Sequence, residues 1–213
     1  MFTLLLLFAT STNAASFNML FGYTESAQSN IDAFPQWVAV VEEQNNEQSF
    51  RTDTWDQFQS VTRKLPRTEQ LDAVNQLVNQ NNYVGDPENY GLVDHWATPE
   101  QLQANGGDCE DFAISKLFAL IQLGWSPESL RLVVVQDTQL NMPHAILAVA
   151  VEQNIWILDN QTTSVMSEAV IEHYAPIYSI SGKQWWLHKP QDMTQGTPMA
   201  AVAHNTAQAP ASK

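Results

Sequence analysis

The sequence predicts an α+β fold, and two observations carry this prediction. As far as Gly124, apolar residues recur at the three- and four-residue spacing of amphipathic helices. After that glycine the pattern changes to short runs rich in β-branched residues, which turns separate. Helices that precede strands in this way favour a helical layer packed on an antiparallel sheet over alternating βαβ units.

Three helices are expected in the N-terminal half. The first covers residues 34–41 and the third follows Pro66 as far as Val78, and both have apolar residues at helical spacing. The second covers residues 52–63, whose composition allows a helix. Residues 81–91 are rich in Asn, Gly and Pro and are expected to form a loop.

Two more helices are expected on either side of a pair of glycines. Thr98 is a suitable N-cap and Pro99 a suitable first residue for a short helix, which Gly106 and Gly107 then end. A longer, more apolar helix starts again at Asp108. The glycines allow the chain to turn from one helix into the next.

Four strands are expected after the helices. They are short runs of β-branched and aromatic residues at 130–136, 144–151, 155–160 and 183–189. Because turns separate them and no helix lies between the first three, we expect an antiparallel meander.

The two ends are expected to lie outside the folded domain, which we place at residues 16–189. Residues 1–15 combine an apolar stretch with small residues at a candidate cleavage site, as in a signal peptide for export. No Lys or Arg precedes the apolar stretch, so a buried segment is the alternative. Residues 190–213 are rich in Ala, Gln, Thr and Pro, a composition typical of a disordered tail.

The chain is strongly acidic, with 23 Asp and Glu residues, 9 Lys and Arg residues and a formal net charge of −14. This charge opposes binding to nucleic acid and to anionic membrane surfaces. The apolar stretch at the N-terminus is too short to span a bilayer, so no membrane insertion is expected after the signal is removed.

The chain has a single cysteine, Cys109, in the segment GGDCED. One cysteine cannot form an internal disulfide, so in an oxidising compartment the thiol is either buried or kept for its reactivity. The start of a helix favours a thiolate and leaves a backbone N–H free to bind an oxyanion. Cys109 is therefore a candidate nucleophile, and a small buried hydrophobic residue is the alternative.

A thiol nucleophile needs a base and a group that orients the base. His144 opens one predicted strand and Asp159 closes the next, and a two-residue turn between them would place Asp159 opposite Ile146. The two side chains are then diagonal neighbours on one face, whereas a three-residue turn would separate them. We predict that His144 is the base and Asp159 the orienting group. The alternative is that neither is catalytic: His144 is then a hydrogen-bonded histidine at the end of a strand, and Asp159 is a turn residue. The other histidines fit the role of base less well: His95, His173, His188 and His204.

Three carboxylates surround the thiol, from Asp108, Glu110 and Asp111. On their own they would oppose ionisation of Cys109. Hard oxygen ligands gathered this closely suit Ca²⁺, and a bound cation would cancel the repulsion. The alternative is that acids in a first helical turn only complement the helix dipole.

These residues resemble a known family. The segment DHWATPEQLQANGGDCEDFAISKLFALIQLGW and the later runs LRLVVVQD, PHAILAVAV and IWILDN are similar to the bacterial transglutaminase-like cysteine proteinases, the proteases of the LapG type. The resemblance extends from about Phe34 to His188. It implies a papain-like, transglutaminase-like core in which Cys109 is the nucleophile, His144 the base and Asp159 the orienting group.

The same resemblance implies a cofactor and two partners. The family binds calcium beside the nucleophile, and the matching positions are Asp108 and Glu110, with Asp111 a weaker candidate. Family members are periplasmic proteases that cut large surface adhesins near the N-terminal end, at a pair of alanines, and so release cells from a biofilm. They are held inactive by the periplasmic domain of an inner-membrane receptor that senses cyclic di-GMP. We therefore expect an adhesin substrate, such a receptor as inhibitor and a periplasmic location.

The expected reaction is hydrolysis of a substrate amide. The oxyanion is expected to be held by the Cys109 backbone N–H and a second donor, for which Trp96, just before the nucleophile segment, is the candidate. Two other functions fit the same fold: acyl transfer to an amine, and protein binding without turnover. Loss of a triad residue is the expected mark of a binding module, and all three are present. Hydrolysis and acyl transfer stay open.

Overall fold

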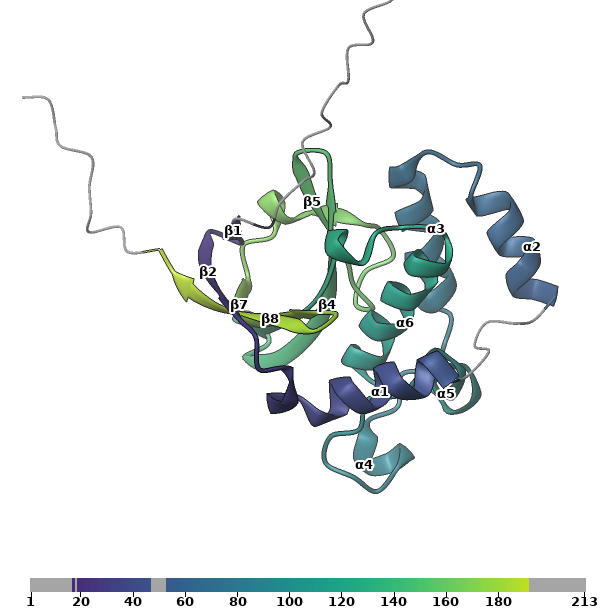
Figure 1. The fold of residues 1–213 in the computed structure, drawn as a ribbon, viewed down its shortest axis with the longest axis horizontal. Helices are drawn as coiled ribbons and strands as arrows, with labels where there is room; N and C mark the ends of the chain where they lie inside the picture. Colours follow the sequence, from purple (N-terminus) through teal and green to yellow (C-terminus); the bar gives the residue numbers. More distant parts are fainter. Residues whose placement is uncertain (1–16, 18, 47–52, 192–213) are drawn as a thin grey trace, which may run out of the picture.

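The computed structural model describes residues 17, 19–46 and 53–191, in which helices gather beside one face of a curved sheet (Figure 1). The predicted α+β class is confirmed. The predicted signal peptide and most of the predicted tail lie outside the described residues. Among the helices that the structure describes, none is long and apolar enough to cross a bilayer.

The helices follow the apolar spacing of the sequence closely. The one helix inside a segment predicted as a loop is a single turn, α4. In chain order they are α1 (Pro35–Asn46), α2 (Asp53–Thr62), α3 (Arg67–Val78), α4 (Asp86–Asn89), α5 (Pro99–Asn105) and α6 (Cys109–Gln122), with three short 3-10 turns, η1 (Ile31–Ala33), η2 (Pro127–Ser129) and η3 (Glu168–Val170).

Within the described residues, eight strands form one antiparallel sheet in the order β1-β2-β8-β7-β3-β4-β5-β6. The strands at the two edges of the sheet have two residues each, and the central strands are mostly buried. The strands are β1 (Met19–Leu20), β2 (Tyr23–Gln28), β3 (Leu130–Asp137), β4 (Met142–Val151), β5 (Asn154–Leu158), β6 (Met166–Ser167), β7 (Tyr174–Ser181) and β8 (Gln184–Pro190).

The expected order of helices followed by a simple meander was wrong in two respects. The hairpin β1–β2 precedes the helices and joins the sheet beside β8, and β7 lies between β8 and β3. Strand β7 contains Pro176, which weakens the sequence signal for a strand, and it is accommodated opposite Val135, where the register shifts after Val134. Pro190, predicted as the start of the tail, pairs with Tyr23 as the last residue of β8.

Successive residues of β4 face two different apolar clusters, as the alternation of a strand requires. One cluster joins the sheet to the helices, and the other fills the opposite face of the sheet. Ala145, Leu147 and Val149 belong to the first, and Ile146, Ala148 and Ala150 belong to the second. Helix α6 packs against β4, β3, α3 and α5, so it is the central helix of the first cluster. This packing fixes the position of the N-terminal end of α6 relative to the sheet.

Candidate active site

The start of α6 is held by a carboxylate of its own first turn. The Asp108 backbone N–H donates to Asp111 Oδ2 at 3.1 Å, and the Ala97 backbone N–H donates to Asp111 Oδ1 at 2.6 Å. Asp111 is fully buried. It therefore ties the segment before α5 to the helix that carries the thiol.

Two glycines make room for this arrangement. Gly106 has a φ of +79°, and a Cβ there would lie 2.7 Å from the Asn82 carbonyl oxygen. A Cβ on Gly107 would lie 2.2 Å from Asp111 Oδ2, a distance that no pair of such atoms tolerates. The sequence indicated a turn here. The structure adds that the second glycine is needed because the Asp111 carboxylate folds back over it.

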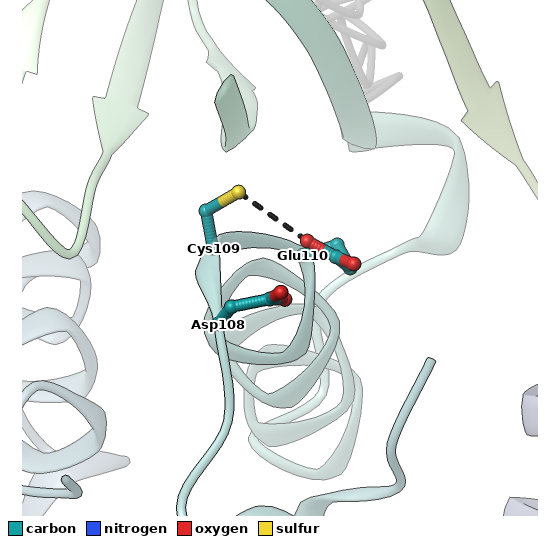
Figure 2. A group of neighbouring side chains, drawn as sticks. All are labelled: Asp108, Cys109 and Glu110. Carbon is teal, nitrogen blue, oxygen red and sulfur yellow. Dashed lines mark hydrogen bonds between the residues drawn. The ribbon is translucent and has the colours of Figure 1, made fainter. Parts of the chain in front are cut away.

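Cys109 is the first residue of α6, as predicted. Its Sγ donates a hydrogen bond to Glu110 Oε2 at 3.3 Å, and Figure 2 shows both groups at the same end of the helix. Burial raises the pKa of the thiol strongly, the charges of Glu110 and Asp108 raise it further, and a backbone hydrogen bond from Ala145 lowers it. With these neighbours alone, the thiol stays protonated.

His144 and Asp159 form a buried pair, with Nε2 and Oδ1 2.9 Å apart. The turn between β4 and β5 has two residues, because Val151 pairs with Asn154, and it gives the register that the sequence argument required. The pairing confirms that the two side chains are neighbours. Because a carboxylate only accepts hydrogen bonds, Nε2 carries the proton toward Asp159, and Nδ1 is the ring nitrogen left for the thiol.

Asp159 has three hydrogen-bond donors. Besides His144, the Gln161 backbone N–H donates to Oδ1 at 2.9 Å, and the Tyr174 hydroxyl donates to Oδ2 at 2.6 Å. Burial alone would raise the pKa of Asp159, but the hydrogen bonds from His144, Tyr174 and Gln161, with the charge of His144, lower it overall. Asp159 is thus a carboxylate at neutral pH, as an orienting group must be.

Of the three predicted catalytic residues, two are hydrogen-bonded to each other and the third is only nearby. His144 and Asp159 are in contact, and Cys109 interacts with the backbone of Ala145, the residue next to His144. The side-chain hydrogen bond of the thiol goes to Glu110 and not to His144. The nucleophile and the base are therefore neighbours at the start of β4, but the proton on the thiol is directed to a carboxylate.

Trp96 does not offer a free indole donor. Its Nε1–H donates to Asp94 Oδ1 at 3.0 Å, and its ring packs edge-on against Trp37. The next backbone N–H, of Ala97, is taken by Asp111. The oxyanion role of Trp96 stays a prediction, and an indole contribution would require the bond to Asp94 to open.

The acidic cluster around α6 is larger than predicted. Besides Asp108, Glu110 and Asp111, it includes Asp86 at the start of α4 and Asp94 in the following loop. Among the described residues, three sets have ligand atoms all within 4.8 Å of one another: Asp108 with Cys109 and Glu110, Asp86 with Asp108 and Asp111, and Asp86 with Asp94 and Glu110. The sequence signal for the two added acids was only their position in an acidic loop before the nucleophile, and no spacing connects them to it.

The cluster is not satisfied by protein donors. Asp86 Oδ1 and Asp108 Oδ1 are buried and have no hydrogen-bond partner. Burial, followed by the proximity of Asp108, raises the pKa of Glu110 to about 9, and burial raises the pKa of Asp111 to about 7. Buried carboxylate oxygens without donors, gathered from two segments, are suited to hold a hard divalent cation.

The fold and the site define a class of protein: a thiol hydrolase whose nucleophile begins a buried helix and whose His–Asp pair lies on neighbouring antiparallel strands, as in papain-like and transglutaminase-like enzymes. The chain belongs to the bacterial transglutaminase-like cysteine proteinases, since the model of that family matches residues 29–188. It is a cysteine protease.

Solved structures of LapG from Legionella pneumophila are similar to this chain. The calcium-bound LapG is 31% identical, covers 70% of this chain and 87% of its own, and superposes with a TM-score of 0.57. An EGTA-treated LapG is also 31% identical, covers 70% of this chain and 86% of its own, and has a TM-score of 0.57. A search of curated protein sequences found no match.

Proposed function

We propose that this protein is a calcium-dependent cysteine endopeptidase that uses Cys109, His144 and Asp159 as its catalytic triad. One observation carries the proposal. A buried His144–Asp159 pair, with Nε2 and Oδ1 2.9 Å apart, lies beside the thiol, while the acidic cluster around that thiol keeps two buried oxygens without donors, Asp86 Oδ1 and Asp108 Oδ1. The pair supplies a base, and the cluster supplies a place for a cation.

The chemistry follows from the orientation of the imidazole. Nδ1 of His144 takes the thiol proton, Sγ attacks the substrate carbonyl carbon, and the protonated imidazole then gives that proton to the leaving amine. Water hydrolyses the thioester that remains on Cys109, with His144 again as base. Asp159 keeps Nε2 protonated throughout and stabilises the imidazolium. Cys109 is the first residue of α6, where backbone N–H groups have no intrahelical acceptor, so its N–H is the donor that we assign to the developing oxyanion.

Calcium would be held by carboxylates of the acidic cluster, with Asp108, Glu110, Asp86 and Asp94 as the donors. When bound, it supplies positive charge beside the thiol and so favours the thiolate. A Glu110 carboxylate that held the ion would accept the thiol hydrogen bond less strongly, and the Cys109 proton would then be available to His144. The calcium-bound state of the similar LapG structure supports the identity of the ion.

The family resemblance also supports a substrate, a location and an inhibitor. We propose that the protein acts in the periplasm, cuts a large surface adhesin near its N-terminus at a di-alanine site, and is held inactive by the periplasmic domain of a cyclic-di-GMP receptor. The apolar start of the sequence supports export, and the family resemblance of the sequence supports the substrate class.

The test uses the purified protein and an adhesin N-terminal fragment with an Ala-Ala site, with calcium or with EGTA. We expect one cut at the alanine pair, no cut by Cys109→Ala, and no cut in EGTA. A matched fragment with the alanines replaced by valines should stay intact. Cleavage by Cys109→Ala would overturn the triad, and full cleavage in EGTA would overturn the calcium dependence. Mass spectrometry of the products separates hydrolysis from transfer to an amine, since only transfer yields cross-linked species.

A further inference from the structure

One buried hydroxyl touches the catalytic pair without belonging to the triad. The Tyr174 hydroxyl donates to Asp159 Oδ2 at 2.6 Å, while His144 and the Gln161 backbone share Oδ1. Tyr174 is 5% exposed, and Asp159 is 2% exposed. A bond this short between a hydroxyl and a buried carboxylate is of the charge-assisted kind.

We propose that Tyr174 is a positioning residue of the protease: its hydroxyl holds Asp159 Oδ2, so that Oδ1 stays directed at His144 Nε2. This inference rests on the proposed triad. The carboxylate of an aspartate rotates readily about its last torsion. A donor on each oxygen fixes that rotation, and a fixed carboxylate in turn fixes the imidazole.

The bond connects parts of the sheet that are not adjacent. Tyr174 lies on β7, opposite Asp137 of β3, whereas Asp159 follows the end of β5. Strands β3 and β4 lie between β7 and β5. The phenol therefore reaches across the site from the far side of His144, and its ring centroid lies 5.8 Å from the imidazole centroid. It constrains both members of the pair.

The ring of Tyr174 also has a packing role, which must be separated from that of the hydroxyl. It belongs to the second apolar cluster, lies edge-on to Phe21, and contacts His173 with centroids 4.3 Å apart. A phenyl ring keeps all of these contacts. Tyr174→Phe therefore removes one oxygen and one hydrogen bond, and it leaves the packing in place.

The experiment compares wild type, Tyr174→Phe and the control Tyr23→Phe, which removes the same hydroxyl from a half-buried tyrosine of β2. We expect Tyr174→Phe to lower kcat about 10- to 100-fold with KM within about twofold, as for loss of one hydrogen bond to a charged group. Tyr23→Phe should leave both constants unchanged. In an Asp159→Asn background, Tyr174→Phe should add less than about a twofold loss, because the two residues act as a unit.

A second readout needs no substrate. Because Cys109 is the only cysteine, iodoacetamide labels one site, and its rate at pH 7 in calcium, followed by mass spectrometry, reports how well His144 activates the thiol. We expect slower labelling of Tyr174→Phe than of wild type at a temperature where both are folded, since loss of the hydroxyl should lower the melting temperature by only a few degrees. If wild type cuts no peptide but this contrast in labelling holds, the proposed substrate is wrong and the positioning role stands. Equal kcat and equal labelling for Tyr174→Phe and wild type would overturn the positioning role.

Discussion

Two groups of buried carboxylates lie near Cys109, and they are built in opposite ways. Asp159 receives hydrogen bonds on both oxygens, from His144, Gln161 and Tyr174, and its pKa is lowered despite burial. In the cluster at the start of α6, Asp86 and Asp108 each keep a buried oxygen without a partner, and burial raises the pKa values of Asp86, Glu110 and Asp111.

The difference separates two ways of keeping a charge inside a protein. A single carboxylate is stable where the fold brings donors to it, and it then works as a permanent part of the site. Several carboxylates without donors repel one another, so they are stable together only as protonated acids or around a cation. The first group is complete from the chain alone, and the second needs something from solution.

The largest expected effect comes from breaking the complete group. Asp159→Asn keeps the shape but presents an amide to His144, which permits the wrong imidazole tautomer, and kcat should fall about 10³- to 10⁴-fold. Calcium affinity, measured by calorimetry, should not change. Asp56→Asn on the exposed face of α2 is the control. A fall of less than about tenfold would show that Asp159 does not orient the base.

The next largest effect concerns Asp111, the carboxylate of the acidic cluster that accepts hydrogen bonds on both oxygens. In Gly107→Ala the new Cβ would lie 2.2 Å from Asp111 Oδ2, so the carboxylate must move and its two backbone bonds are lost. We expect a loss of about 3 kcal/mol in the free energy of unfolding, measured in urea with calcium. Gly85→Ala is the matched control, because its Cβ meets nothing closer than 3.9 Å. Equal stability of the two variants would contradict the proposed role of Gly107.

Glu110→Gln should have effects of opposite sign with and without calcium. In EGTA it removes a buried carboxylate that has no cation, so the variant should melt a few degrees higher than wild type, about 1 kcal/mol of stabilisation. In calcium it removes a ligand, so calcium affinity and kcat should both fall by about 10- to 100-fold. Glu100→Gln, at an exposed position of α5, controls for loss of surface charge. A variant that binds calcium as wild type does would exclude Glu110 from the ligand set.

The last prediction concerns the pH dependence of stability. Glu110 and Asp111, with pKa values of about 9 and about 7, bind their protons more tightly in the folded state than in the unfolded state. Unfolding therefore releases protons, and the free energy of unfolding without calcium should decrease as pH rises from about 5 to 9. Calcium should flatten this slope, and Glu110→Gln should flatten its upper part. Urea titrations at several pH values measure how the free energy of unfolding depends on pH. A dependence that calcium leaves unchanged would contradict the cation site.

Local rules predicted the nucleophile helix, because helical spacing and the two glycines placed Cys109 at a helix start. For the His144–Asp159 pair they left one question open, the length of the turn, and the structure answers it with two residues. These features depend only on residues close in sequence. The class of the fold followed from the same patterns.

Contacts between distant segments were not predictable in the same way. Asp86 and Asp94 reach the cluster through a loop whose path no periodicity fixes. Tyr174 lies on β7, where Pro176 masks the strand, and its bond to Asp159 depends on strand order in the sheet. The hairpin β1–β2 was missed because β1 has only two residues and β2 is mostly polar, so it is recognisable only by its pairing with β8.

The overlap between Gly107 and Asp111 has a consequence for how this sequence can drift. Because a side chain at position 107 and a carboxylate at position 111 compete for one volume, neither position is free to vary by itself. A relative that carries a larger residue at the first position must have abandoned the carboxylate at the second, and with it the tie to Ala97. Substitutions at positions 107 and 111 should therefore occur together among relatives. A larger residue at position 107 should destabilise the protein unless position 111 also changes.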